Sequence, residues 1–320
     1  MEENLLQCIN NLLISIVVPV YNSYNNIHLL VEEIDILITS NNWNCELLLI
    51  DDGSSDNSYF RISQLSKQYL FVKGVKLSRN FGQQIAIKTG LELAQGDLIA
   101  ILDDDLQDPP SVLIDFIDKI QSGYDVVYGV RKKRKESLFK KMFYSMYYII
   151  LKRISKIDLP LDSGDFCMMN RKVVGIILSM NEKNLFLRGM RSWVGFNQIG
   201  VEYERSHRIG GESGYTLKKL IEIAKDGVFS FSIFPLKIIT YTGVIGLLIA
   251  VFYSSVVFYY YFTEKNPVGG YTSLVLIIMF FSSLILISLS IIGEYLRRIF
   301  DETRNRPYTI IESKINFDNN

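Results

Sequence analysis

Three consecutive acidic residues, Asp103, Asp104 and Asp105, are the side chains of this sequence best suited to chemistry. They follow a short apolar run at residues 97–102 and precede Leu-Gln-Asp-Pro-Pro at residues 106–110. The apolar run predicts a buried strand, and open α/β sheets bind ligands at the carboxyl ends of such strands. Neighbouring carboxylates repel one another unless a divalent cation lies between them. The triplet therefore predicts a metal site for a ligand that carries phosphates, or else an acidic turn that caps the following helix.

A second acidic pair and an aromatic residue lie at the ends of two further predicted strands. Asp51 and Asp52 end the apolar run at residues 45–52, and Tyr21 ends the run at residues 14–21. In a parallel sheet these ends share one edge with the triplet. There, Tyr21 can stack on a base, and Asp52 can accept a hydrogen bond from a base or a ribose. Taken alone, each feature also fits a strand-end aromatic or a turn with a helix cap.

The sequence lacks the glycine-rich fingerprints that place a phosphate at the start of a helix. Neither Gly-x-Gly-x-x-Gly after the first strand nor Gly-x-x-x-x-Gly-Lys-Ser/Thr occurs. A nicotinamide-dependent oxidoreductase is therefore disfavoured. Neutralising a leaving diphosphate would fall to a cation on the acidic triplet.

Strands and helices are predicted to alternate along residues 14–131. Because the strands are apolar throughout, they are typical of a mostly parallel sheet covered by helices on both faces, an α/β fold. The predicted strands are residues 14–21, 45–52, 72–78, 97–103 and 125–131. The predicted helices are residues 25–39, a segment that ends near residue 68, and residues 82–94 and 110–121.

Composition limits the partners and the compartment. The 34 basic and 34 acidic residues balance, so net charge does not favour a nucleic-acid partner. Three scattered cysteines without a Cys-x-x-Cys pair favour a reducing compartment over a disulfide framework or a zinc site. The two histidines exclude a histidine-rich metal site. Residues 1–11 are largely polar, so no signal peptide is predicted.

Two long apolar stretches near the carboxyl terminus predict a transmembrane hairpin. Residues 238–262 and 271–292 carry no charge, and about 20 apolar residues are enough to span a bilayer. The short link at residues 263–270 contains a proline and two glycines, which suits a turn between two helices. A pair of buried core helices is the alternative.

Basic residues flank this hairpin on one side. Lys237 precedes the first stretch, and Arg297, Arg298, Arg304 and Arg306 follow the second, whereas the link holds a single lysine. The positive-inside rule then places the large domain and the tail in the cytoplasm, on a multi-pass protein of the inner membrane.

Two segments are candidates for helices at the membrane surface. A basic run at residues 131–135 leads into an aromatic and basic stretch at residues 138–154, and residues 216–235 end just before the first apolar stretch. Basic amphipathic helices bind at membrane interfaces. A solvated charge run followed by a core helix is the alternative for the first segment. The predicted domains are a cytoplasmic α/β domain at 1–215, a juxtamembrane helix at 216–235, a transmembrane hairpin at 236–295 and a cytoplasmic tail at 296–320.

Several short motifs occur together along the chain. They are Pro-Val-Tyr-Asn at 19–22, Ile-Asp-Asp-Gly-Ser-Ser-Asp at 50–56, Ser-Arg-Asn-Phe-Gly at 78–82, Leu-Asp-Asp-Asp-Leu-Gln-Asp-Pro-Pro at 102–110, Gly-Val-Arg at 129–131, Ser-Gly-Asp at 163–165, Gly-Glu-Ser at 211–213 and Gly-Glu-Tyr-Leu-Arg-Arg-Ile at 293–299. In combination they resemble family 2 glycosyltransferases with the GT-A nucleotide-sugar-binding fold, above all the dolichol-phosphate mannose synthase-like polyprenyl-phosphate glycosyltransferases. The resemblance covers nearly the whole chain. It implies transfer of one sugar from a nucleotide donor, with UDP favoured, to undecaprenyl phosphate at the cytoplasmic membrane face, and related enzymes can assemble as tetramers.

The resemblance also implies roles for individual residues. Donor binding falls to Pro19, Tyr21, Ile50, Asp52, Asp103 and Asp104. Binding of Mg²⁺ or Mn²⁺ falls to Asp103, Asp105 and Gln107. Contacts with the phosphate groups of donor or acceptor fall to Arg131 and Arg208, and Asp165 would lie near the acceptor phosphate as a base or an orienting group.

Four positions depart from the pattern of the family. Ser23 stands where the family often has Glu, Asp104 where it often has Ala, and Gly214 where it often has Lys. Cys167 stands where glucosyl-transferring members often have Arg, and this pattern is closer to the aminoarabinose-type transferases. The sugar is therefore left open.

Two other functions are the alternatives. A processive polysaccharide synthase on the same fold would need a Gln-x-x-Arg-Trp-type motif and more spans, and Arg-Ser-Trp at residues 191–193 does not match it. A non-catalytic, membrane-anchored scaffold that binds a nucleotide sugar is the other alternative. The presence of Asp103, Asp105 and Gln107 argues against lost chemistry.

Overall fold

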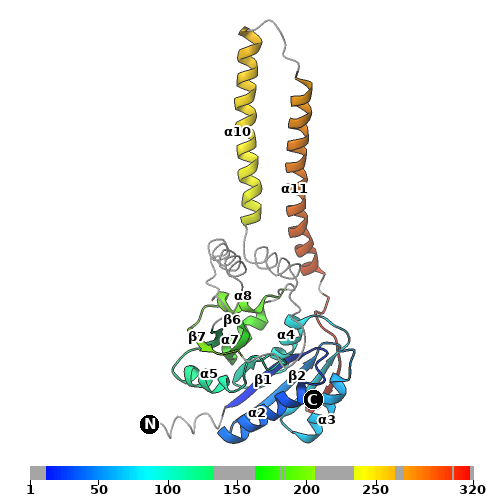
Figure 1. The fold of residues 1–320 in the computed structure, drawn as a ribbon, viewed down its shortest axis with the longest axis vertical. Helices are drawn as coiled ribbons and strands as arrows, with labels where there is room; N and C mark the ends of the chain where they lie inside the picture. Colours follow the sequence, from blue (N-terminus) through cyan, green and yellow to red (C-terminus); the bar gives the residue numbers. More distant parts are fainter. Residues whose placement is uncertain are drawn as a thin grey trace. The chain divides into compact units, whose positions relative to one another are not determined.

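Two units make up the described part of the chain. The computed structural model describes residues 12–132, 163–180, 182, 185–205, 234–263, 270–304 and 306–317. One unit contains a β-sheet with its helices and includes residues 306–317, and the other contains two long helices within residues 234–304 (Figure 1).

The first unit begins with the alternation of strands and helices that the sequence predicts. These elements are β1 (Leu13–Val20), α2 (Ile27–Asn41), β2 (Asn44–Asp51), α3 (Ser58–Gln68), β3 (Val72–Leu77), α4 (Gln83–Leu93), β4 (Leu98–Ile101), α5 (Val112–Gln121) and β5 (Val126–Arg131). The elements that follow were not predicted, and they are β6 (Ser163–Asn170), α7 (Arg171–Ser179), α8 (Leu187–Trp193), β7 (Gln198–Tyr203) and β8 (Ile311–Ile315).

Within the described residues these strands form one eight-stranded sheet in the order β7-β5-β6-β4-β1-β2-β3-β8. The pairs β1–β2, β1–β4, β2–β3 and β5–β7 are parallel, so the sheet is mostly parallel, as predicted. The central strands are apolar on both faces because helices cover both. Ile16, Val17, Leu48 and Leu49 are each at most 1 % exposed. Burial of this apolar surface is the main force that holds the sheet together.

The parallel strands β1, β2 and β4 bring their carboxyl ends to one edge of the sheet. Hydrogen bonds continue the pairing beyond the strands, because the N–H of Asp52 donates to the carbonyl of Val20 and the N–H of Leu102 donates to the carbonyl of Val17. The residues that follow these strands, Tyr21 and Asp103 among them, therefore lie at the edge that the sequence indicated.

Strand β6 enters the sheet between β4 and β5 and runs antiparallel to both. Its register pairs Cys167 with Ile101 of β4. In an antiparallel pair, a position two residues after one partner faces a position two residues before the other. The same register therefore brings Asp165 toward Asp103, although the two lie far apart in the sequence.

Helix α4 packs closely against β1. A Cβ atom at position 90 would lie 2.2 Å from Cγ1 of Val17, so only glycine permits this approach. On the same helix the side chain of Lys88 is 2 % exposed, and its Nζ lies 3.7 Å from the centre of the Tyr308 ring. These contacts fix α4, whose first residues lie at the carboxyl edge of the sheet.

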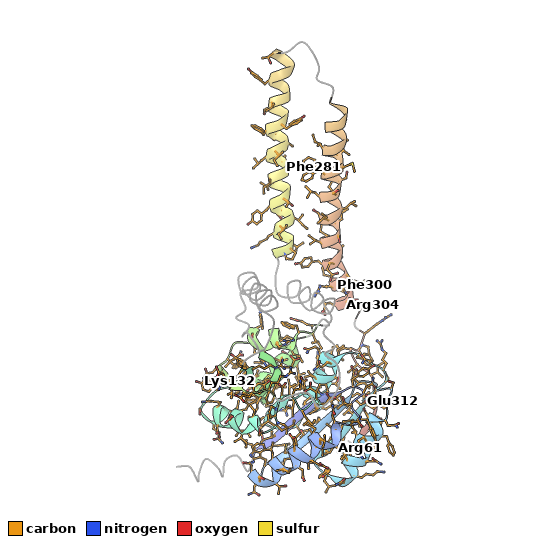
Figure 2. All side chains as sticks on the ribbon, viewed as in Figure 1. Arg61, Lys132, Phe281, Phe300, Arg304 and Glu312 are labelled. Carbon is orange, nitrogen blue, oxygen red and sulfur yellow. The ribbon has the colours of Figure 1, made fainter. Side chains whose placement is uncertain are left out.

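The carboxyl-terminal residues return to the first unit and extend the sheet. Strand β8 pairs antiparallel with β3, and Lys76 faces Ser313. Lys76 also forms an ion pair of 3.0 Å with Glu312, which is labelled in Figure 2. The Tyr59 and Ser313 hydroxyl groups lie 2.6 Å apart. These residues were predicted only as a tail.

The second unit contains the helices α10 (Phe234–Thr263) and α11 (Tyr271–Thr303), which lie side by side (Figure 1). A Cβ atom at position 246 would lie 3.2 Å from the ring of Phe281, labelled in Figure 2. Both helices contain stretches long and apolar enough to cross a membrane, and almost none of these residues is buried. Such exposed apolar surface is stable in lipid and unfavourable in water. Helix α11 continues beyond the predicted apolar stretch to Thr303.

Candidate active site at the carboxyl edge of the sheet

Asp52 holds the loop that leads into α4. Its two carboxylate oxygens accept hydrogen bonds from the N–H groups of Phe81, at 2.7 Å, and Gly82, at 2.8 Å. Burial raises the pKa of Asp52, and these hydrogen bonds oppose the rise. Next to it, Gly53 has φ +65°, and a Cβ there would lie 2.3 Å from the backbone of Arg79. Asp52 thus has a structural role in this loop that the sequence did not reveal, and its place in the donor site stays a prediction.

Tyr21 lies at the end of β1 and is 49 % exposed, so its ring is free to meet a planar ligand. The neighbouring Asn22 has φ 52°, and its Oδ1 accepts a hydrogen bond of 2.9 Å from the N–H of Ser55. This bond ties the loops after β1 and β2 together. Pro19 and Ile50 pair in register one step inside the sheet, and both are buried. They support the strand ends, and direct contact with a donor stays a prediction.

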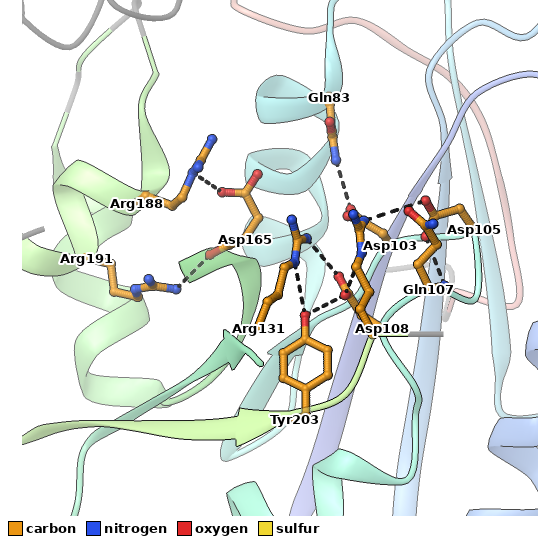
Figure 3. A network of polar contacts seen from close by, with 12 residues as sticks. Gln83, Asp103, Asp105, Gln107, Asp108, Arg131, Asp165, Arg188, Arg191 and Tyr203 are labelled. Atoms are coloured by element: carbon orange, nitrogen blue, oxygen red, sulfur yellow. Dashed lines mark hydrogen bonds and ion pairs between the residues drawn. The ribbon is translucent and has the colours of Figure 1, made fainter. Parts of the chain in front are cut away.

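The three aspartates of the triplet have different partners. Oδ1 of Asp103 accepts a hydrogen bond of 2.9 Å from Nε2 of Gln83 (Figure 3). Burial and the nearby carboxylates of Asp165, Asp108, Asp105 and Asp104 raise the pKa of Asp103 to about 7. A bound cation would offset both the burial of this carboxylate and the repulsion from its neighbours.

The other two members of the triplet face different neighbours. Burial raises the pKa of Asp104 to about 6, while a hydrogen bond from the Ser23 side chain opposes the rise. Two of the four positions that depart from the family pattern, Ser23 and Asp104, are therefore in contact. Oδ1 of Asp105 accepts a hydrogen bond of 3.2 Å from the N–H of Gln107, and its Oδ2 lies 4.0 Å from Arg205.

Asp108 is the centre of a buried polar network beside the triplet. It is 1 % exposed and accepts hydrogen bonds from Tyr203, at 2.5 Å, and from Arg131, at 3.3 Å (Figure 3). Arg205 forms a further ion pair with it at 3.4 Å. Although burial disfavours the charged guanidinium, the Asp108 carboxylate raises the pKa of Arg131. Arg131 is thus held as a fixed cation at the edge of the sheet.

Asp165 is bound from two sides. Its Oδ2 accepts a hydrogen bond of 2.9 Å from Nε2 of Gln84, and its Oδ1 lies 3.1 Å from Nε of Arg188. Below it, the buried Arg191 donates to the carbonyl of Gly164 at 3.5 Å. Figure 3 shows that Asp165 and Asp103 lie on either side of Arg131. The edge therefore combines carboxylates for a cation with guanidinium groups for phosphates.

The structure brings together most of the predicted site residues. Those near the edge are Tyr21, Asp52, Asp103, Asp104, Asp105, Gln107, Arg131 and Asp165. Arg208, the Gly-Glu-Ser motif, the predicted surface helix at residues 138–154 and residues 216–233 of the second predicted surface helix lie outside the described residues. The last two residues of that second segment, 234 and 235, begin α10. Sequence reasoning missed Gln83, Gln84, Asp108, Arg188, Arg191, Tyr203 and Arg205. Asp108 lies within the motif at residues 102–110, and its burial in the folded protein distinguishes it from the other acidic residues of that motif.

The residues at the edge fit a divalent cation that is bound jointly by protein and ligand. No group of three or more His, Cys, Asp or Glu side chains in the described parts of the chain is arranged to hold a metal by itself. The predicted set contains two carboxylates and one amide, Asp103, Asp105 and Gln107. Burial and, next to it, the neighbouring carboxylates raise the pKa of Asp103, and a cation at these oxygens would favour the ionised form. Oxygen ligands of this kind, completed by phosphate oxygens, suit Mg²⁺ or Mn²⁺.

Residues 15–177 match the family model described as "Glycosyl transferase family 2". The chain belongs to glycosyl transferase family 2. A protein named "Uncharacterized glycosyltransferase YkcC" from Bacillus subtilis (strain 168) is 42 % identical over 95 % of this chain and 95 % of its own length. The "SfII prophage-derived bactoprenol glucosyl transferase" from Shigella flexneri is 36 % identical over 93 % of this chain and 97 % of its own length.

Membership of family 2 confirms the predicted fold class, a mostly parallel GT-A sheet, with two apolar helices that are candidate membrane spans. Among solved structures, the chain is similar to glucosyl-3-phosphoglycerate synthase from Mycobacterium tuberculosis in complex with Mn²⁺, uridine diphosphate and glucosyl-3-phosphoglycerate. That likeness has a TM-score of 0.49 at 17 % identity and covers 70 % of this chain and 80 % of that chain.

Proposed function

We propose that this family 2 glycosyltransferase transfers a single sugar from a nucleotide-sugar donor, with UDP favoured, to a polyprenyl phosphate such as undecaprenyl phosphate. The observation that carries the proposal is the likeness over 93 % of the chain to a bactoprenol glucosyl transferase, a match long enough to include both apolar helices. Two helices that are long and apolar enough to span a bilayer would hold the enzyme at the membrane, where a polyprenyl phosphate resides.

The reaction is an in-line displacement at the anomeric carbon. An oxygen of the lipid phosphate attacks that carbon, the bond from the carbon to the donor diphosphate breaks, and the nucleoside diphosphate leaves with the electron pair. The configuration at the anomeric carbon is inverted. A phosphate monoester has its second pKa near 6, so the acceptor is already ionised at neutral pH and needs no strong base.

Positioning and charge stabilisation then supply most of the catalysis. Asp103 and Asp105, with Gln107, would hold Mg²⁺ or Mn²⁺, and the cation would neutralise the leaving diphosphate. Tyr21 and Asp52 contribute to the base and ribose site, and Arg131 binds a phosphate group with its fixed planar fork. Asp165, bound to Arg188 and Gln84, orients the acceptor rather than removing a proton.

We place the enzyme in the cytoplasmic membrane with its catalytic unit in the cytoplasm. Lys237 in the first turn of α10 and the arginines near the end of α11 support this orientation, because cytoplasmic flanks of membrane spans carry an excess of basic residues. Fusions of a periplasm-dependent reporter to residue 266 and to the carboxyl terminus test it. We expect reporter activity only from the fusion at residue 266. Reporter activity from the fusion at the carboxyl terminus would show that the topology is the opposite of the proposed one. Assembly as a homo-tetramer stays a prediction.

The transfer itself is tested with purified full-length protein in detergent. The protein is given radiolabelled UDP-sugars, Mn²⁺ or Mg²⁺ and undecaprenyl phosphate, and label that enters the chloroform phase is counted. We expect labelled lipid with one donor of the panel, and loss of that label in the Asp105→Ala variant. No labelled lipid with any common donor would refute the transfer, and full activity of Asp105→Ala would refute the metal assignment.

A further inference from the structure

Gln84 connects three parts of the catalytic unit through one amide group. Its Nε2 donates a hydrogen bond of 2.9 Å to Oδ2 of Asp165, on β6. Its Oε1 accepts a hydrogen bond of 3.0 Å from the N–H of Leu187, the first residue of α8. Gln84 itself lies in the first turn of α4. One side chain thus joins α4, β6 and α8, which are remote in sequence.

Glutamine is the side chain of this length that can make both bonds at once. A primary amide offers an N–H donor and a carbonyl acceptor, whereas a glutamate offers acceptors and a lysine offers donors. A glutamate at this position would also set a negative charge against Asp165. The two hydrogen bonds therefore depend on the amide itself and not on packing volume alone.

The neighbouring residue on α4 makes the equivalent contact on the other side of the site. Nε2 of Gln83 donates to Oδ1 of Asp103 at 2.9 Å. The consecutive residues Gln83 and Gln84 thus bind two different carboxylates. Gln83 binds Asp103, which is on the proposed metal side, and Gln84 binds Asp165, which is on the proposed acceptor side. Because Gly90 seats α4 closely on β1, this turn has little freedom to shift. The β4–β6 register brings Asp103 and Asp165 near each other, and α4 contributes to the orientation of both carboxylates.

The hydrogen bond from Leu187 to Gln84 also ties α8 to α4. Helix α8 carries Arg188, whose Nε lies 3.1 Å from Oδ1 of Asp165. Asp165 is therefore held between Gln84 and Arg188, and Gln84 also fixes the helix from which Arg188 projects (Figure 3 shows Asp165 with Arg188). Loss of the amide would remove one of the two contacts of the Asp165 carboxylate and also the hydrogen bond that holds the start of α8, from which the other contact comes.

We propose that Gln84 is a positioning residue for sugar transfer, which orients Asp165 and Arg188 relative to Asp103 and does not itself touch the substrates. This role rests on the proposed function, because it needs Asp165 to face the acceptor. A displacement of about 1 Å in a reacting constellation is known to cost about a hundredfold in rate. Loss of Gln84 should therefore lower kcat for the transfer step and leave the affinity for the nucleotide unchanged.

The test compares Gln84→Met, which keeps the length and loses both hydrogen bonds, with Gln84→Glu, which keeps the acceptor and adds a charge. The matched control is Gln68→Met, an exposed glutamine at the end of α3. We expect kcat for lipid glycosylation to fall about 10- to 100-fold in both Gln84 variants. The affinity for UDP with Mn²⁺, measured by calorimetry, should stay within about twofold of the wild type. Gln68→Met should match the wild type in both.

A double-mutant cycle separates positioning from general structural damage. If Gln84 acts through Asp165, then Gln84→Met should change the residual rate of an Asp165→Asn enzyme far less than that of the wild type. Equal effects in both backgrounds, an unchanged kcat, or a parallel loss of UDP affinity would each overturn the positioning role. A wild-type enzyme without lipid glycosylation would overturn the proposed function and this role together, whereas an active wild type with an unaffected Gln84→Met variant would overturn the role alone.

Discussion

Replacing Asp103 by asparagine should stabilise the protein while it abolishes sugar transfer. Burial and four neighbouring carboxylates raise the pKa of Asp103 from its ordinary value of 3.8 to about 7. An ionised Asp103 is therefore an unfavourable group in the folded protein without ligands. Asparagine has the same shape, can still accept the hydrogen bond from Gln83, and carries no charge.

The size of the effect follows from the pKa. Each tenfold change in proton affinity is worth about 1.4 kcal/mol, so a rise from 3.8 to about 7 corresponds to about 4 kcal/mol at full effect. The Asp103 side chain is only partly buried, and solvent screening reduces this figure. We expect a gain of about 1–2 kcal/mol, or about 2–8 °C in melting temperature for a unit of this size.

The stability gain of Asp103→Asn should increase with pH. The folded carboxyl group keeps its proton up to about pH 7, whereas the unfolded one releases it near pH 3.8. The stability that this proton provides is complete below the unfolded pKa and is lost as the pH rises through the folded pKa. Asparagine does not titrate, so the advantage of Asp103→Asn should be small at pH 4, grow through this window and be complete above pH 7.

The assay is the melting temperature of the catalytic unit in purified full-length protein, measured by fluorescence with EDTA at pH 5 and pH 8. EDTA is needed because a bound cation would stabilise the wild type selectively. Asp115→Asn on α5 is the control, since it removes one exposed acid away from the site. An Asp103→Asn variant that melts at or below the wild-type temperature at pH 8, or that gains equally at both pH values, would refute the reasoning.

Two further predictions concern the packing that positions α4. Gly90→Ala should lower the free energy of unfolding by about 1–3 kcal/mol in chemical denaturation, because the added Cβ would lie 2.2 Å from Val17. The control is Gly175→Ala on α7, where the added Cβ meets nothing within 4 Å and should cost nothing. Equal effects of the two substitutions would contradict the close approach of α4 to β1. Tyr308→Ala should cost about 1–3 kcal/mol in chemical denaturation, because it removes a partly buried ring and uncovers the buried Lys88. Tyr308→Phe should restore most of this loss because it retains the ring face. An Ala variant as stable as the Phe variant would show that the ring contact does not matter.

The sequence predicted the elements that depend on local patterns. Strands β1, β2 and β4 are largely apolar runs, and the helices between the strands have regular apolar spacing, so the spacing of apolar residues and the turn residues between them were sufficient. Strand β3 contains two lysines, and it was predicted from its Val and Leu residues. The carboxyl ends of parallel strands meet at one edge of a sheet, and this rule alone placed Tyr21, Asp52 and Asp103 together. Family membership confirmed the resulting fold class.

The missed elements depend on contacts between distant segments. Strand β6 lies antiparallel between β4 and β5, and no local sequence pattern predicts with which strands it pairs. Strand β8 reads Ile-Glu-Ser-Lys-Ile, which is polar enough to pass for a tail, and it becomes a strand because the edge of β3 offers unpaired backbone groups. The roles of Gln84 and Asp108 likewise arise from side chains that meet only in the folded protein.

The measurement that tests the central claim most directly is mass spectrometry and NMR of the lipid formed from a nucleotide sugar and undecaprenyl phosphate by the full-length enzyme. We predict one product, whose mass exceeds that of the acceptor by a single sugar residue and whose anomeric configuration is opposite to that of the donor. It should be absent with Asp103→Asn. A lipid that bears several sugars, a product of retained configuration, or release of free sugar and nucleoside diphosphate with no glycolipid would contradict the account.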